Sequence, residues 1–136
     1  QDPTNEILWF SLGSVYDNLG MQDEAVEAYS KSLGIKPDYF DANYNLGALY
    51  FNKAVQMVND ANDMWKPRMS KEESTKQSDM EAGGKAMFST ALPFLEKALD
   101  VEPNDRETLR SLRDIYARVG MDDKMLEVSA KLKSME

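Results

Sequence analysis

The stretch WFSLGSVYDNLGMQDEAVEAYSKSLGIKP, from Trp9 to Pro37, decides the fold of this chain. Its first half places Trp9, Leu12 and Tyr16 at the i, i+3, i+7 spacing of one helical face. Gly20 suits the left-handed end of that helix, and Pro37 suits the end of a second one. The stretch therefore predicts two antiparallel helices joined by a short turn.

Small residues in the same stretch predict how the two helices pack. Gly13 lacks a side chain where the partner helix must approach, and Ala25 is small where the returning helix packs. Asp38 follows Pro37 and offers an N-cap for a third helix. We therefore expect the next helix to begin directly after this pair.

The same frame recurs twice. NYNLGALYFNKA (43–54) repeats the first half and ALPFLEKALDVEP (91–103) the second, while LRSLRDIYARVGMDDKMLEVSAKL (109–132) repeats both. Asn43 stands in place of the tryptophan in the second copy. A unit of this kind cannot bury its apolar face alone, so three copies predict stacked helix pairs.

The frame resembles that of tetratricopeptide repeats, W-x2-L-G-x2-Y, a turn glycine, A-x3-F/Y and P. In the first copy the matching residues are Trp9, Leu12, Gly13, Tyr16, Gly20, Ala25, Tyr29, Leu33 and Pro37. The third copy departs from the frame at Arg113 and Ser129, which hold the small and the aromatic position. The resemblance implies an all-α, right-handed α-solenoid of three helix pairs. We expect one domain over 1–136, with repeats at about 6–39, 40–105 and 106–136.

Residues 56–87 interrupt the second copy. That copy starts near Phe40 and the third near Arg106, so about 32 residues exceed the regular period. Ala54 holds the place of the turn glycine, and nothing there ends the helix. One apolar stripe continues beyond it, at Ala54, Val58, Ala61 and Trp65. The first helix of this pair should run on.

A returning arm is predicted by equivalent signals. Met80, Gly84, Met87 and Ala91 have the same spacing, which sets 58 against 83, 61 against 80 and 65 against 76. Between the arms, Pro67 breaks a helix, and Ser70 with Glu73 forms a capping-box pattern. The second pair should therefore extend into a protruding hairpin, on the order of 20 Å long, with its turn near residue 70. The alternatives are a break near Gly83–Gly84 with a separate helix at Pro93, or a disordered loop.

Composition excludes several functions. With 24 acidic and 16 basic residues the net charge is -8, which disfavours binding to nucleic acid or to an anionic membrane. The absence of Cys and His removes the usual catalytic triads and zinc sites, and NDAND (59–63) lacks the glycine and closing glutamate of a calcium loop. We expect no enzyme activity, cofactor or metal.

No apolar run is long enough to span a membrane. Because the chain begins with Gln1, we expect a fragment or a processed protein, and its compartment stays open.

The resemblance implies a concave groove, lined by the first helix of each pair, that binds a protein or peptide partner. Carried over by position, its residues are Phe10, Ser14, Asp17, Tyr44, Asn45, Ala48, Phe51, Asn52, Arg110, Asp114 and Arg118. Tyr44, Asn45, Phe51 and Asn52 are the strongest candidates, because amides donate and accept while aromatic rings give rigid contact area. The alternative is that the rings pack under the hairpin and the amides are only solvated.

The carboxylate clamp known from co-chaperones has Lys, Asn, Asn, Lys and Arg at five positions. This chain has Phe10, Ser14, Asn45, Glu107 and Ser111 at those positions, in the same order. Only Asn45 matches, so we expect no chaperone-tail binding. A row of Arg106, Arg110 and Arg113 could receive an acidic segment. The alternative is that the row is solvated or paired with Glu107, Asp114 and Asp105.

Met64, Trp65 and Met69 lie near the predicted hairpin turn and form a candidate contact surface for a partner or a second copy. The alternative is that the methionines of the insertion only fill the seam between its arms. The sequence thus favours a non-enzymatic protein-interaction or scaffold module. A structural or homo-oligomerisation role, as part of a longer repeat protein, is the other possibility.

Overall fold

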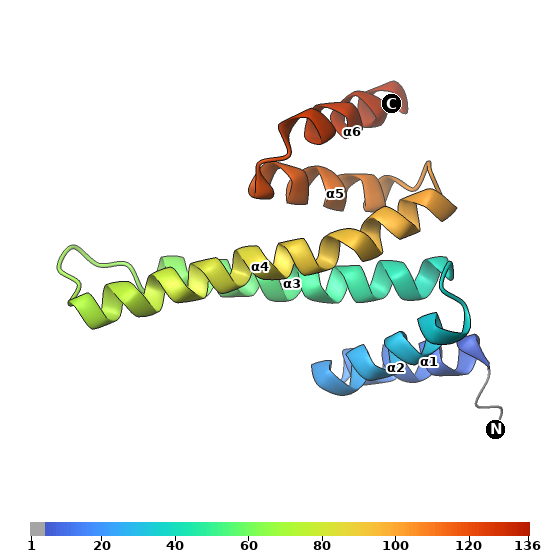
Figure 1. The fold of residues 1–136 in the computed structure, drawn as a ribbon, viewed down its shortest axis with the longest axis horizontal. Coiled ribbons are helices and arrows are strands. Elements are labelled where there is room, and N and C mark those ends of the chain that lie inside the picture. The colour runs from blue at the N-terminus through green and yellow to red at the C-terminus, as the bar shows by residue number, and fades with distance from the viewer. Residues whose placement is uncertain (1–4) are drawn as a thin grey trace.

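The computed structural model describes residues 5–136, which contain six helices and no strand. The helices are α1 (Glu6–Asn18), α2 (Gln22–Ile35), α3 (Phe40–Asp63), α4 (Lys71–Val101), α5 (Arg106–Val119) and α6 (Asp122–Ser134). They form three pairs, α1 with α2, α3 with α4 and α5 with α6, and the pairs stack through contacts of α2 with α3 and of α4 with α5 (Figure 1). The predicted all-α solenoid of three pairs is confirmed.

In two of the three pairs, a glycine ends the first helix, as the repeat frame predicts: Gly20 follows α1 and Gly120 follows α5. Gly20 and Gly120 adopt left-handed φ angles of 75° and 78°, which residues with a side chain rarely take. Ala54 holds the same place in the second pair, lies inside α3 and is buried. Without the glycine, α3 continues.

Two further glycines set the distance between paired helices. A Cβ atom on Gly13 would lie 2.6 Å from the Tyr29 ring, and one on Gly47 would lie 2.7 Å from Leu95 Cγ. The large side chain of the second helix therefore fills the space that the glycine leaves.

The connection from α2 to α3 differs from the prediction. Tyr39, and not Asp38, is the N-cap of α3, and no side chain caps it. Instead the buried Asn43 side chain donates from Nδ2 to the carbonyl oxygens of Pro37 and Tyr39, both at 3.0 Å. This satisfies two carbonyls of the turn and explains why an amide can replace the tryptophan of the frame.

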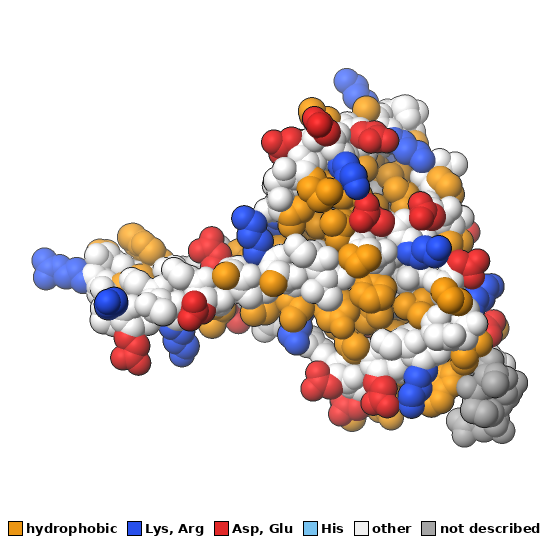
Figure 2. Space-filling view, viewed as in Figure 1, with side chains coloured by type: hydrophobic (Ala, Val, Ile, Leu, Met, Phe, Trp, Pro, Cys, Tyr) orange, Lys and Arg blue, Asp and Glu red, His pale blue; other side chains and the backbone are white. Residues whose placement is uncertain are grey.

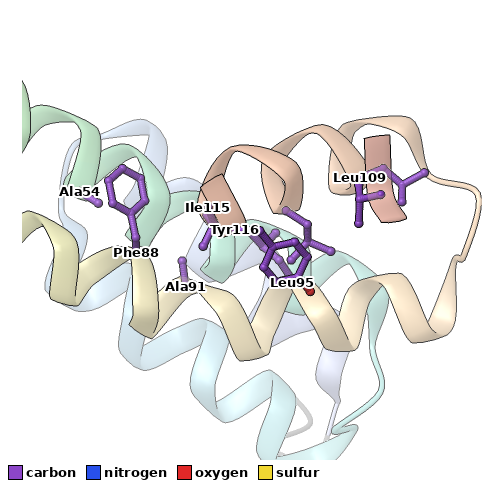
Figure 3. Packing of buried hydrophobic residues seen from close by; sticks show 9 residues of the cluster. Ala54, Phe88, Ala91, Leu95, Leu109, Ile115 and Tyr116 are labelled. Atoms are coloured by element: carbon purple, nitrogen blue, oxygen red, sulfur yellow. The ribbon is translucent and has the colours of Figure 1, made fainter. Parts of the chain in front are cut away.

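The helix α4 lies at the centre of the core. Its buried Phe88, Ala91 and Leu95 lie among residues of α5 that include Leu109 and Ile115 (Figure 3). A second cluster joins Ala25 and Tyr29 of α2 to Leu46 and Leu49 of α3. Each pair thus buries apolar side chains against the next. Figure 2 shows further apolar side chains on the surface of the stacked pairs.

The second pair extends well beyond the stack. The helices α3 and α4 have 24 and 31 residues, against 13 and 14 in α1 and α2. At 1.5 Å per residue their free end projects by about 20 Å. Figure 1 shows this end extending beyond the other two pairs. The predicted helical hairpin is confirmed.

The predicted alternative of a broken return arm is wrong, because α4 is continuous through Gly83, Gly84 and Pro93. A Cβ atom on Gly84 would lie 2.8 Å from Val58 Cγ2, and one on Gly83 would lie 2.6 Å from Met57 Cε. These glycines let the two arms approach closely and do not interrupt the helix.

The turn of the hairpin confirms one local prediction and corrects another. Ser70 Oγ accepts a hydrogen bond from Glu73 N at 3.1 Å, and Glu73 Oε2 accepts one from Ser70 N at 2.8 Å, which completes the capping box. However, α3 ends at Asp63, so Trp65 is not part of the apolar stripe and its side chain is 66% exposed. The stripe ends at the buried Ala61.

Candidate functional site

The eleven predicted groove residues come from α1, α3 and α5, which contact one another in the order α1, α3, α5. We call the side of these helices that carries those residues the inner face. The structure brings most of them together in two clusters, one near α1 and α2 and one at the base of the hairpin.

The first cluster surrounds the Tyr29 hydroxyl. Tyr29 donates to Asp17 Oδ2 at 3.3 Å and accepts from Asn45 Nδ2 at 3.4 Å, and Ser14 also hydrogen-bonds to it. Burial raises the pKa of Tyr29 above 10.0, so the hydroxyl stays neutral. Ser14, Asp17 and Asn45, which were predicted as ligand contacts, therefore link α1 and α3 to Tyr29 of α2. The repeat frame predicted only a packing role for Tyr29.

Phe10 also packs against other residues of the chain. Its half-buried ring lies 5.8 Å from the Tyr29 ring and 5.6 Å from the Tyr39 ring, the latter edge to face. Part of the ring is therefore used in packing between α1, α2 and the turn before α3.

Tyr44 lies at the acidic start of α5. Its half-buried ring stacks on Phe40 with centroids 5.9 Å apart. Burial, followed by the negative charges of Glu107 and Asp105, raises the pKa of Tyr44 above 10.0. The Tyr44 hydroxyl is therefore a neutral hydrogen-bonding group beside two carboxylates.

The second cluster lies where α3, α4 and α5 meet. The half-buried Phe51 packs edge to face on the buried Phe88 at 5.4 Å, and the exposed Arg118 guanidinium lies 4.9 Å from the Phe88 ring centroid. Asn52 follows Phe51 on α3 and is exposed, whereas Ala48 is half-buried. Phe88 was missed as a site residue, although its spacing from Gly84 and Ala91 places it on the apolar stripe of the return arm.

The arginine row of α5 is paired within the chain. Arg110 contacts Glu107 at 2.6 Å, Arg113 contacts Asp114 at 3.5 Å, and Arg106 donates to the carbonyl of Met135. Arg110 and Arg113 thus pair with Glu107 and Asp114, as the alternative predicted, whereas Arg106 bonds to a backbone carbonyl and not to Asp105.

The hairpin tip combines an exposed indole with basic groups. Met64 and Met69, which precede and follow the exposed Trp65 in the sequence, are half-buried. Lys66 Nζ contacts Glu73 Oε1 at 2.7 Å, and this bond, with that from the Ser70 backbone, lowers the pKa of Glu73 below 4.5. Figure 2 shows basic side chains at the far end of the arm. Met57, Met80 and Met87 are half-buried along the arms, as the seam-filling alternative predicts.

Residues 18–53 match the family model described as TPR repeat. This stretch therefore carries a tetratricopeptide repeat. The match covers α2 and the first part of α3, and it stops just before Ala54, where the missing turn glycine lets the helix continue.

Several known proteins are similar to this chain over part of their length. The peroxisomal targeting signal receptor of Candida glabrata is 27% identical over 128 residues, which are 90% of this chain and 20% of the receptor. That of Candida albicans is 44% identical over 50 residues, or 37% of this chain and 8% of the receptor. This chain spans a fifth or less of the length of the receptors that it matches.

Two further similarities cover most of the repeats. The photosystem I assembly protein Ycf3 of Acaryochloris marina is 23% identical over 89% of this chain and 63% of its own length. A solved structure of a MamA RS-1 ArsTM double mutant covers 98% of this chain and 76% of that one, with a TM-score of 0.39 and 17% identity. The tetratricopeptide fold described above rests on the helices and their repeat frame, and not on that structure.

Residues 5–136 contain no metal-binding cluster of acidic side chains and no membrane-spanning helix. No group of three or more acidic side chains lies close enough there to hold a metal ion. Within the same residues, no helix has the length and hydrophobicity needed to cross a membrane.

Proposed function

We propose that this chain binds a protein or peptide partner on its inner face and hairpin, and that it does not catalyse a reaction. The observation that carries the proposal is the second cluster. There the exposed Arg118 guanidinium lies 4.9 Å from the Phe88 ring of the Phe51–Phe88 pair, and the exposed Asn52 follows Phe51 on α3. An aromatic floor with exposed donors suits a peptide that presents an apolar side chain and a carbonyl or carboxylate.

The repeat architecture and the relatives support binding. Stacked repeats form extended concave surfaces that other proteins use for recognition. Among the relatives, the receptor is named for a targeting signal and the photosystem I protein for assembly, so both names describe association with other molecules. The raised tyrosine pKa values of the inner face follow from burial and from neighbouring carboxylates, which are structural causes.

Affinity capture from an extract of the source organism tests the inner face. Asn52→Ala with Arg118→Ala removes both exposed groups and leaves the Phe51–Phe88 pair in place. Ser89→Ala with Lys97→Ala, a matched exposed pair on α4, is the control. We expect the double inner-face variant to recover at least tenfold less partner than the wild type or the control. Equal recovery by all three would contradict binding at the inner face.

The exposed Trp65 supports a second candidate, homo-oligomerisation through the hairpin tip. An indole of this size exposed at the end of an arm is a common contact residue. Sedimentation of the wild type and of Trp65→Ala with Met69→Ala tests this candidate. It requires a dimer in the wild type that the variant loses, and a dimer that survives in the variant would exclude the tip as its contact.

A further inference from the structure

The free end of the hairpin is basic in a chain that is otherwise acidic. Residues 64–77, which form the turn and the first two turns of α4, carry four basic and two acidic side chains, for a net charge of +2. The rest of the chain carries 12 basic and 22 acidic side chains, for a net charge of -10. We call residues 64–77 the basic tip. Figure 2 shows Lys and Arg side chains at this far end of the arm.

Three of the four cations of the basic tip have no partner within the described chain. Lys66 pairs with Glu73. Arg68, Lys71 and Lys76 are exposed and take part in no ion pair among residues 5–136. Lys71 is also the first residue of α4, where the helix dipole favours a negative charge. Because this placement does not stabilise the helix, the charge is better explained by a ligand outside the chain.

Trp65 is held close to these cations. The residue after it, Lys66, contacts Glu73 in the first turn of α4 at 2.7 Å. Gln77 Nε2 donates to the carbonyl oxygen of Ala61 at 2.9 Å, which joins the second turn of α4 to the end of α3. The turn that carries the exposed indole is therefore fixed against the two turns of α4 that carry the lysines. An exposed tryptophan beside basic groups is a common centre of protein recognition.

The length of the arm separates the basic tip from the acidic stack. The free end projects by about 20 Å. At physiological ionic strength, charges more than about 8 Å apart are largely screened from each other. An anionic group at the end of the arm therefore responds to the positive charge of the basic tip more than to the negative charge of the stack. The net charge of -8 does not exclude an anionic partner at this place.

The mixed charges of α4 favour a protein segment over a continuous polyanion. Lys71 and Lys76 line one shallow hollow, and the other residues that line it are Glu72, Thr75 and Asp79. A nucleic acid or an anionic membrane presents a continuous negative surface, which would also face the two carboxylates. A protein segment can place its own carboxylates on the two lysines and leave Glu72 and Asp79 in water.

We propose that the basic tip binds an acidic segment of a partner protein. An apolar side chain of that segment packs on Trp65, and its carboxylates pair with Arg68, Lys71 and Lys76. This role rests on the proposed binding at the hairpin and adds the charge of the partner. Contact between the tips of two copies is disfavoured, because it would bring the same three cations of both copies together.

A library of random peptides, selected on the full chain at low salt, tests the charge of the ligand. Arg68→Glu with Lys71→Glu reverses two cations of the basic tip. Lys85→Glu with Lys97→Glu, at two exposed positions of α4 outside the basic tip, is the control with the same net charge. Circular dichroism checks that each variant folds.

We expect the selected peptides to carry a large apolar residue flanked by Asp or Glu. They should bind the tip variant, and also Trp65→Ala, at least tenfold more weakly than the wild type or the control. Salt at about 1 M shortens the screening length to about 3 Å, so it should weaken the same peptides at least tenfold.

Different failures have different meanings. Peptides that need the basic tip but are neutral or basic would overturn the acidic ligand and leave binding at the hairpin in place. Peptides that need Asn52 and Arg118, with none that needs the tip, would overturn the proposal and support the inner face. Selection of no peptide at all would contradict both.

Two further measurements test other occupants of the basic tip. One is sedimentation with phosphatidylserine vesicles, and the other is the mass of the chain in solution. Vesicle binding that the tip variant loses would overturn the proposal, because a membrane would then be the occupant. A wild-type dimer that the tip variant loses would overturn it as well, because the occupant would then be a second copy.

Discussion

Single residues set the spacing between the paired helices. Gly13, Gly47 and Gly84 each lie in a helix where a Cβ atom would come within 3 Å of a neighbouring side chain. In the hairpin this matters most at Gly84, because the Ala54 carbonyl oxygen would also lie 3.1 Å from the added atom and cannot rotate away. The arms can pack this closely only because the position has no side chain.

We expect Gly84→Ala to lower the free energy of unfolding by about 1–2 kcal/mol, since overpacking exceeds the gain in helix propensity. Gly34→Ala is the control, because Gly34 lies in α2 with nothing within 4 Å of the added atom, and it should stabilise the chain by roughly 0.5 kcal/mol. Urea unfolding measures both changes. A Gly84→Ala chain as stable as the wild type would show that the arms are not in close contact.

Tyr116 links stability to alkaline pH. Its hydroxyl donates to Glu96 Oε2 at 2.9 Å, and burial, followed by this carboxylate, raises the pKa of Tyr116 far above 10.0. The unfolded tyrosine ionises near pH 10 and the folded one does not, so its contribution to stability is complete below pH 10 and is lost as the pH rises above it.

We therefore expect the unfolding free energy of the wild type to fall more steeply between pH 10 and pH 11 than that of Tyr116→Phe. At pH 7 the variant should be about 1 kcal/mol less stable, because the hydrogen bond to Glu96 is lost. Parallel stability curves above pH 10 would contradict the raised pKa.

At the scale of elements, the hairpin follows from signals that lie close together in the sequence. Replacement of a turn glycine by Ala54, and the capping box of Ser70 and Glu73, predicted the long arms and the start of α4. The apolar stripe did not predict that α3 ends at Asp63 and not near Trp65. At the exposed end of the arm, packing against other elements does not fix the last residue of the helix. The roles of Asn43 and Phe88 depend on contacts between different elements, which local patterns do not specify.

The capping box should stabilise the start of α4 locally. Ser70→Ala removes the acceptor for Glu73 N and should cost about 1 kcal/mol there, or roughly fivefold faster amide exchange over residues 72–76. Ser78→Ala, at an exposed position farther along the same helix, should leave exchange in this segment unchanged. Equal protection in Ser70→Ala and in the wild type would mean that the cap does not hold the turn.

At the scale of the whole molecule, the stack has three different surfaces. At one end α1 exposes the apolar side chains of Leu8, Leu12, Val15 and Leu19. The other end is formed by α6, and the hairpin projects from the middle pair. We propose that all of 1–136 acts as one domain, because the central pair shares a core with each of its neighbours. Partner recognition on the inner face and hairpin is the central claim for this molecule.

Site-specific photo-crosslinking in an extract of the source organism tests that claim most directly. A photoreactive amino acid is placed in turn at Asn52 on the inner face, at Trp65 on the tip and at Lys97 on the exposed side of α4, three positions that are all exposed. Positions 52 and 65 should yield specific crosslinks to a protein partner, and position 97 should yield none. Crosslinks from position 97 alone, or at equal levels from all three positions, would contradict recognition through the inner face and hairpin.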